Sequence, residues 1–153
     1  MASQIECAVT IERPATTVYE YFLDLDRNAS DPGVASASKV PPGPTGPGTE
    51  FHFSYAKGPD TMMRFTGLEP SRRIGFVGKV GPLAPAGDLL FEPLDGSTRL
   101  TVRVDPHPAL PLRPLSPLIR RKGRQVWEAR FARVKAALEA PTPRRDPARD
   151  ATA

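Results

Sequence analysis

Cysteine and histidine are scarce in this sequence, which has one cysteine and two histidines among 153 residues. A single cysteine cannot form an intramolecular disulfide, so we predict a protein of a reducing compartment, the cytoplasm. Cys7 lies among alternating apolar residues and is expected to be a small buried strand residue rather than a reactive thiol. Neither His52 nor His107 has a second ligand at metal-binding spacing, so we predict no metal site and no cofactor.

Long hydrophobic runs and several catalytic motifs are also absent. No stretch of eighteen apolar residues occurs, and the first residues lack a basic region followed by an apolar block. We therefore expect neither a membrane span nor a signal peptide. The G-x-S-x-G motif of nucleophilic hydrolases does not occur. Prolines interrupt the glycine-rich stretch 41–48, and they remove the amide donors that a phosphate-binding loop needs.

Proline and positive charge are abundant and unevenly placed. The chain has 19 prolines, against a usual content of ~5%, and they cluster in predicted loops. Eleven of the 21 basic residues but only four of the 17 acidic ones lie at or beyond Arg113. This surplus favours either an anionic partner such as nucleic acid, or simply a solvated helix face followed by a basic tail. We assign residues 1–140 to the folded domain and predict that 141–153, which lack apolar content, are disordered.

Alternation of apolar and polar residues predicts a succession of strands. The predicted strands are Ile5–Glu12, Val34–Val40, Thr49–Ala56, Thr61–Leu68, Arg73–Val80, Asp88–Leu94 and Thr98–Asp105. Of these, 34–40 has the weakest pattern because it is rich in Ala and Ser. Asp95-Gly96 is a typical tight-turn pair between the last two strands. Because short turns join consecutive strands, we predict one antiparallel sheet of six or seven strands.

Two helical patterns complete the chain. Pro14 begins a short helix that ends near Asp26, and residues 26–33 have room for a second helical turn. The longest pattern, Pro114–Ala140, has Ser116 as its expected N-cap. Its apolar stripe consists of Ile119, Gly123, Trp127, Phe131, Val134 and Leu138. Its polar face consists of Arg120, Arg121, Lys122, Arg124, Arg133 and Lys135.

Five segments resemble the START-like, helix-grip superfamily (SRPBCC), and in particular its bacterial polyketide cyclase/dehydrase and lipid-transport proteins. These segments are VTIERPATTVYEYFLDLD (9–26), GPGTEFHF (46–53), FTGLEPSRRIGFVG (65–78), FEPLDGSTRLTVRV (91–104) and the helix 127–138. The resemblance implies an α+β helix-grip fold, in which the antiparallel sheet wraps around the long C-terminal helix and leaves a deep hydrophobic cavity between them. The sequence departs from this pattern in region 26–48, where many relatives carry a tryptophan and this chain has Asn28-Ala29-Ser30-Asp31-Pro32.

Eight apolar side chains are our candidates for lining such a cavity, although the same residues would also serve as plain core. They are Phe53, Tyr55, Met63, Phe65, Phe76, Phe91, Trp127 and Phe131. Tyr55 and Trp127 carry polar groups that are suited to orienting a ligand oxygen. Arg64 and Arg103 fall on outward-facing positions and are expected in solvent; only a register slip of one residue would turn either into the cavity.

Three functions are compatible with the sequence. The first interpretation is binding of a small hydrophobic molecule, for transport or sequestration, in the cavity between the sheet and the C-terminal helix. The alternative is a polyketide-type aromatase/cyclase or dehydratase, which needs an acid or base within reach of its substrate; no carboxylate or histidine falls on an apolar face. The third is a nucleic-acid or ribosome-associated protein that acts through the basic C-terminal helix with a steep salt dependence, although that face lacks interleaved aromatic residues.

Overall fold

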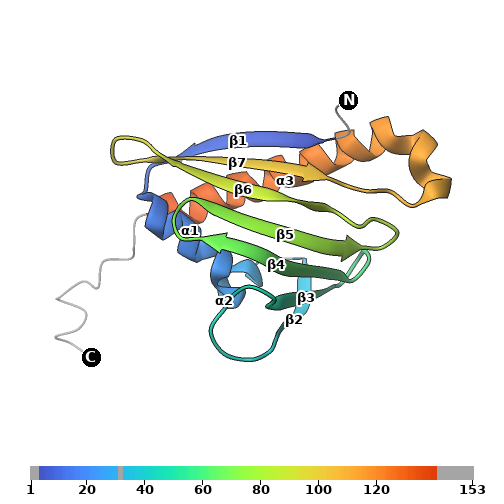
Figure 1. Cartoon of the computed structure of the whole chain (residues 1–153), viewed down its shortest axis with the longest axis horizontal. Helices are drawn as coiled ribbons and strands as arrows, with labels where there is room; N and C mark the ends of the chain where they lie inside the picture. Colours follow the sequence, from blue (N-terminus) through green and yellow to red (C-terminus); the bar gives the residue numbers. More distant parts are fainter. Residues whose placement is uncertain (1–3, 31–32, 141–153) are drawn as a thin grey trace.

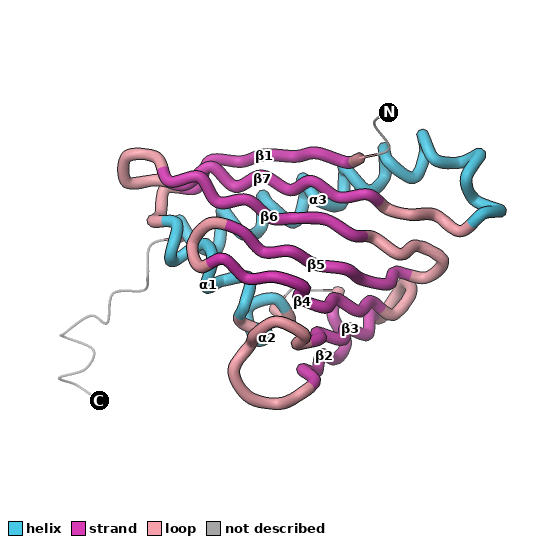
Figure 2. The backbone as a smooth tube through the Cα atoms, viewed as in Figure 1, coloured by secondary structure: helices cyan, strands magenta, loops and turns pink. Residues whose placement is uncertain are grey.

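One antiparallel sheet of seven strands forms most of the protein in the computed structural model, which describes residues 4–30 and 33–140. The strand order is β1-β7-β6-β5-β4-β3-β2, and all helices lie on one face of the sheet (Figures 1 and 2). The strands are β1 (Ile5–Ile11), β2 (Val34–Val40), β3 (Glu50–Tyr55), β4 (Thr61–Glu69), β5 (Arg73–Val80), β6 (Ala86–Pro93) and β7 (Thr98–Asp105). The predicted tail 141–153 lies outside the described residues.

Hairpins build the sheet from β2 to β7, and β1 then joins the far edge by pairing with β7. The predicted tight turn at Asp95-Gly96 is confirmed: the Leu94 amide donates to the Ser97 carbonyl at 2.8 Å, and Gly96 has a φ of 77°. Strand β6 begins at Ala86, two residues before the predicted start. The alternation pattern missed Gly87, which pairs with Val104 in β7.

Two short helices follow β1, α1 (Ala15–Leu23) and α2 (Leu25–Asn28). The second helical turn is therefore present, and the Asp24 side chain caps it by accepting from the amides of Asp26 and Arg27. The Asn28 side chain closes the α1–α2 corner, because its Nδ2 donates to the carbonyls of Tyr21, Phe22 and Asp24 at 3.1, 3.3 and 2.7 Å.

The long helix α3 (Ser116–Glu139) lies against β1 behind the sheet (Figure 1). The prediction that Ser116 is its N-cap is wrong. The 3₁₀ helix η1 (Leu110–Leu115) leads directly into α3, so Leu115 holds the cap position, and the Ser116 hydroxyl donates to the Arg113 carbonyl at 2.6 Å. The predicted connector is thus partly helical.

Only one stripe of α3 is buried. Phe131, Val134 and Leu138 are core residues, and Gly123 allows the helix to approach β1 closely, since a Cβ there would lie 2.5 Å from Ile5 Cδ1. At its C-terminal end, the Lys135 ammonium donates to the Thr10 carbonyl at 2.6 Å and to Glu139 Oε2 at 2.7 Å. These contacts tie α3 to the end of β1.

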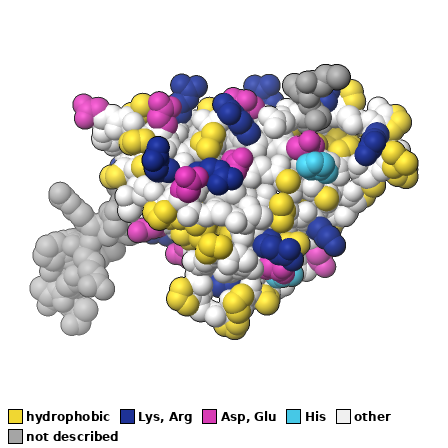
Figure 3. Space-filling view, viewed as in Figure 1, with side chains coloured by type: hydrophobic (Ala, Val, Ile, Leu, Met, Phe, Trp, Pro, Cys, Tyr) yellow, Lys and Arg dark blue, Asp and Glu magenta, His cyan; other side chains and the backbone are white. Residues whose placement is uncertain are grey.

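The outer face of the sheet carries paired charges, and Figure 3 shows acidic and basic side chains beside one another over it. Arg64 contacts Glu50 at 2.6 Å, and Arg103 Nε lies 3.5 Å from Glu6. Both arginines are therefore on the solvent side, as predicted. Glu50 also contacts His52 at 2.9 Å. The hydrogen bonds from Arg64 and His52 lower the pKa of Glu50 below its ordinary value.

Gly87→Ala tests the close approach of β6 to β7. A Cβ at Gly87 would lie 2.0 Å from the Arg103 carbonyl oxygen and 2.7 Å from Val104 Cα, and backbone cannot move aside without parting the strands. We expect the free energy of unfolding to fall by about 2–3 kcal/mol in a urea titration. The control is Gly46→Ala, where a Cβ meets nothing within 4 Å. Equal stability of the two variants would contradict this packing.

Glu50→Gln tests the outer-face ion pairs through their pH dependence. A carboxyl whose pKa is lowered by folding stabilises the protein above its unfolded pKa, and this stabilisation is lost as pH falls through the folded pKa. The difference in Tm between wild type and Glu50→Gln should therefore be largest near neutral pH and shrink on acidification below the ordinary carboxyl pKa. Thermal scans from pH 7 to pH 3, with Glu20→Gln on the exposed side of α1 as control, measure it. A difference that does not vary with pH would exclude this role for Glu50.

Candidate ligand pocket

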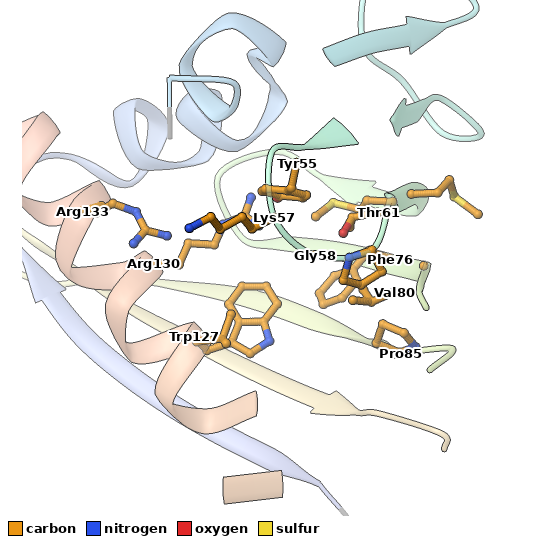
Figure 4. A pocket seen from close by; sticks show the side chains of 15 residues that line it. Tyr55, Lys57, Gly58, Thr61, Phe76, Val80, Pro85, Trp127, Arg130 and Arg133 are labelled. Carbon is orange, nitrogen blue, oxygen red and sulfur yellow. The ribbon is translucent and has the colours of Figure 1, made fainter. Parts of the chain in front are cut away.

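A pocket of about 330 Å³ lies between α3, the β3–β5 part of the sheet and the loops that follow β3 and β5 (Figure 4). It exists because α3 packs mainly on β1, at the other edge of the sheet. The pocket occupies the space that this leaves between α3 and strands β3, β4 and β5. The lining residues are Tyr55, Lys57, Gly58, Pro59, Thr61, Met62, Met63, Phe76, Gly78, Val80, Pro85, Val126, Trp127, Arg130 and Arg133.

One end of the pocket is apolar. The Trp127 ring lies on the helix side with its centroid 5.9 Å from that of Phe76 in β5, and it makes an edge contact of 5.8 Å with Phe131. Val80 and Pro85 continue this wall beside Phe76 (Figure 4). Aromatic and aliphatic side chains of this kind offer contact area to a nonpolar ligand.

The other end of the pocket carries three cationic side chains, Lys57 from the β3–β4 loop and Arg130 and Arg133 from α3 (Figure 4). Arg130 is held in place: its Nη2 donates to Asn28 Oδ1 at 2.8 Å, and its guanidinium lies 5.4 Å from the Trp127 ring centroid. This hydrogen bond and the cation–π contact fix the orientation of the guanidinium plane.

Arg133 is exposed, as its assignment to the polar face of α3 predicted, and it also lines the pocket. Val126, Arg130 and Arg133 follow one another at steps of four and three, so they form a stripe displaced by one residue from the buried stripe. A displacement of one residue is a rotation of about 100° around the helix. The helix therefore presents one edge to the core and the adjacent edge to the pocket.

The eight predicted cavity residues divide into three groups. Tyr55, Met63, Phe76 and Trp127 line the pocket. Phe53 lines a smaller neighbouring pocket of about 90 Å³, which shares Tyr55, Arg130 and Arg133 with the larger one. The remaining three are core residues and line neither: Phe65 packs on Phe51, Phe91 packs on Tyr19 and Phe22, and Phe131 packs on Trp127.

Sequence reasoning missed the loop residues Lys57 and Pro85 and the helix residue Arg130. Loop residues have no periodicity that would indicate where they point. For Arg130, the available signal was its position three residues after Trp127 on the same helix. Its contact with Asn28 depends on how α2 meets α3, which no local pattern in the sequence predicts.

The chemistry available in the pocket is limited. Among the described residues, the lining includes the hydroxyls of Tyr55 and Thr61 and three cations, but no Asp, Glu or His. His52 contacts Glu50 and His107 contacts Asp105, both away from this pocket. The lining therefore offers apolar contacts and hydrogen-bond donors, and a proton acceptor in it would have to be the neutral amine of Lys57 or the phenolate of Tyr55.

Cys7 belongs to the core of β1, as predicted. It is buried beneath α3, and its Sγ lies 3.7 Å from the Arg124 carbonyl oxygen. Burial raises the pKa of its thiol, and the nearby Glu128 carboxylate adds to this effect. A raised pKa keeps Cys7 protonated and unreactive.

The nucleic-acid interpretation depends on the basic residues of α3 that lie outside the pocket, and it stays a prediction. Arg121 and Lys122 are exposed, and Arg124 pairs with Glu128 four residues later. No helix among residues 4–30 and 33–140 is long and apolar enough to cross a membrane.

A curved antiparallel sheet, a long C-terminal helix and a pocket between them define a helix-grip protein, and the predicted fold is thereby confirmed. The sequence profile of the family "Polyketide cyclase / dehydrase and lipid transport" matches residues 3–139. The chain belongs to this family. The resemblance seen in the sequence is thus confirmed over nearly the whole chain.

Solved structures with the same fold are distant in sequence. Protein MLL2253 from Mesorhizobium loti superposes with a TM-score of 0.74 at 12% identity, covering 91% of this chain and 98% of that one. Ara h 8.0201 superposes with 0.71 at 16% identity, covering 90% and 98%. DynU16, a putative protein of the dynemicin biosynthetic locus, superposes with 0.70 at 22% identity; 94% of this chain spans 49% of DynU16. A search of curated proteins finds no significant match.

Asn28→Ala tests the support of Arg130. The substitution removes the acceptor for Arg130 and the three hydrogen bonds that close the α1–α2 corner. We expect a loss of about 1–2 kcal/mol in the free energy of unfolding and a change in the near-ultraviolet circular dichroism of Trp127. Ser30→Ala, which removes one exposed hydrogen bond to the Arg27 carbonyl, is the control. An unchanged Trp127 signal would show that Asn28 does not orient Arg130.

Proposed function

We propose that the protein binds a small, largely apolar molecule in the pocket beside α3, for transport or for sequestration. The observation that carries this proposal is the pocket itself, a space of about 330 Å³ whose walls include Met63, Phe76 and Trp127. Small-molecule sites are concave, mostly apolar and supplied with a few placed polar groups, and this pocket has those properties. The description of the family, which includes lipid transport, supports the same function.

The second candidate is a polyketide-type cyclase or dehydratase. It is supported by the description of the family and by the Tyr55 hydroxyl, which lines the same pocket as Lys57 and Arg130. Cations near a hydroxyl are suited to stabilising an enolate that forms during an aldol reaction. Turnover of a poly-β-ketone by the wild type, with loss of turnover but retained binding in Tyr55→Phe, would select this candidate over a carrier.

Trp127 makes the proposal directly measurable, because it is the only tryptophan in the chain and lines the pocket. A bound ligand should change its fluorescence intensity or emission maximum in proportion to occupancy. Native mass spectrometry of protein purified from its own host, followed by extraction, would identify a co-purifying ligand. A clean apo mass, together with no thermal shift or Trp127 response across a panel of lipids and aromatic polyketides, would overturn the proposal.

Val80→Phe tests the position of the ligand. Val80 lies at the apolar end of the pocket, and a larger side chain there should fill space that the ligand needs. We expect the Kd of any ligand that binds the wild type to rise by about tenfold or more, while the free energy of unfolding changes by less than about 1 kcal/mol. Phenylalanine leaves Trp127 as the sole tryptophan reporter.

Val77→Phe is the matched control for this variant. Val77 belongs to the same strand but pairs beside Arg64 on the opposite face of the sheet. It should keep wild-type affinity, since the added ring points away from the pocket. Equal loss of affinity in both variants would place the ligand elsewhere.

A further inference from the structure

We propose that the end of the molecule formed by η1 and the first turns of α3 docks on the surface of an anionic lipid bilayer. Exposed leucines and exposed cations carry this proposal. They are Leu110, Leu115 and Leu118 with Arg113, Arg121 and Lys122, and together they are called the α3 entry surface. Figure 3 shows hydrophobic and basic side chains beside one another at the end of the molecule where Figure 1 places η1. Docking there is a function separate from ligand binding in the pocket.

Exposed apolar side chains cluster at this end of the protein. Of the six large hydrophobic residues that are exposed within 4–30 and 33–140, four lie between positions 110 and 126. Leu110 is 71% exposed, and Leu115 and Leu118 are 48% and 50% exposed. Single exposed leucines are ordinary, whereas a cluster of them marks a surface that contacts another apolar phase. The acyl boundary of a bilayer, just below the headgroups, is such a phase.

The same segment is strongly cationic. Residues 106–127 include five Lys or Arg and no Asp or Glu. Three of the five, Arg113, Arg121 and Lys122, are exposed, and none of these three forms an ion pair with another residue of the part that the structure describes. Anionic headgroups attract basic side chains that lie next to membrane-inserting residues, so the charge of the α3 entry surface is complementary to an anionic leaflet.

The helical part of the α3 entry surface faces away from the core. Leu118 and Lys122 are one turn apart on α3, and at about 100° per residue Lys122 is half a turn away from the buried Phe131. Leu115, three residues before Leu118, continues this row into η1. When the leucines enter the acyl boundary, the long side chain of Lys122 can still reach the phosphates.

The α3 entry surface continues to the rim of the pocket. Val126 follows Lys122 by one turn of α3, is exposed and lines the pocket. Pro85 of the β5–β6 loop also lines the pocket, and Leu83 of the same loop forms a β-bridge with Pro108, just before η1. Docking through this surface therefore places one rim of the pocket beside the bilayer.

The leucines favour a membrane over a nucleic acid as the partner. A nucleic acid binds cations through its phosphates and binds aromatic side chains by stacking, and the exposed leucines contribute to neither. An anionic bilayer uses both kinds of residue, because its headgroups attract the cations and its acyl boundary accepts the leucines.

Co-sedimentation of the whole chain with lipid vesicles measures docking. The vesicles consist of phosphatidylcholine alone, or of phosphatidylcholine with about one third phosphatidylglycerol. We expect the anionic vesicles to bind the wild type at least about tenfold more tightly, and the affinity to fall as salt is raised. Equal binding to both kinds of vesicle, or binding to neither, would overturn the proposal.

Leu115→Gln with Leu118→Gln tests the apolar part at unchanged net charge. Both side chains are about half exposed, so the fold should be retained, as thermal unfolding checks. We expect the affinity for anionic vesicles to fall about tenfold or more, because two leucines no longer enter the acyl boundary. The matched control is Val40→Gln with Leu94→Gln, at sites that are 51% and 43% exposed elsewhere on the protein. An equal loss in both pairs, or no loss in the first, would overturn the assignment.

Arg121→Gln with Lys122→Gln tests the cationic part. We expect affinity for anionic vesicles to fall about tenfold, since two charges no longer meet the headgroups. Arg72→Gln with Arg99→Gln is the control; it removes the same charge from exposed positions in the β4–β5 turn and at the start of β7, away from η1. Equal weakening by both pairs would assign the effect to overall charge and overturn the role of this surface.

Two further measurements separate docking from the other functions. If a single-stranded RNA binds the wild type more tightly than the anionic vesicles do, and Leu115→Gln with Leu118→Gln leaves that binding unchanged, the surface is a nucleic-acid site and the proposal is overturned. Val80→Phe in the pocket should bind vesicles as the wild type does, which would support docking as a separate function. A failure of docking leaves the proposed binding of a small molecule as it stands.

Discussion

The packing of α3 against β1 is the contact on which both the core and the pocket depend. Gly123 lets the helix approach Ile5, and the Lys135–Thr10 and Glu139–Glu12 hydrogen bonds hold its other end. Because these contacts draw α3 toward one edge of the sheet, only its stripe from Phe131 to Leu138 is buried. The neighbouring stripe is left to form one wall of a pocket above β3, β4 and β5.

The same geometry explains why one helix serves two purposes. A stripe of a helix is about one residue wide at each turn, and residues displaced by one position point about 100° away. Phe131 and Val134 therefore contribute to the core, whereas Arg130 and Arg133, each one position earlier, face the pocket. Trp127 lies at the boundary, where it contacts Phe131 on one side and Phe76 on the other.

Family membership and geometry support different levels of functional statement. The match over residues 3–139 establishes the family, and the solved structures, all at low identity, establish the fold. Neither specifies a ligand, because one fold of this kind serves many functions. In this chain, Asn28 from the α1–α2 corner accepts a hydrogen bond from Arg130 on α3, and Arg130 lines the pocket.

Strand alternation and helix periodicity were sufficient to predict the seven strands, the Asp95-Gly96 turn and the long C-terminal helix, because these patterns are local and repeat along the chain. They also placed Arg64 and Arg103 on the outer face and Tyr55, Met63, Phe76 and Trp127 on the face that lines the pocket. The tertiary structure decided which inward-facing residues are core and which line the pocket. Phe65 and Phe76 follow the same alternation, but Phe65 packs on Phe51 whereas Phe76 borders the pocket. It also brought Lys57, Arg130 and Arg133 into one pocket lining, because their convergence depends on how α3 crosses the sheet.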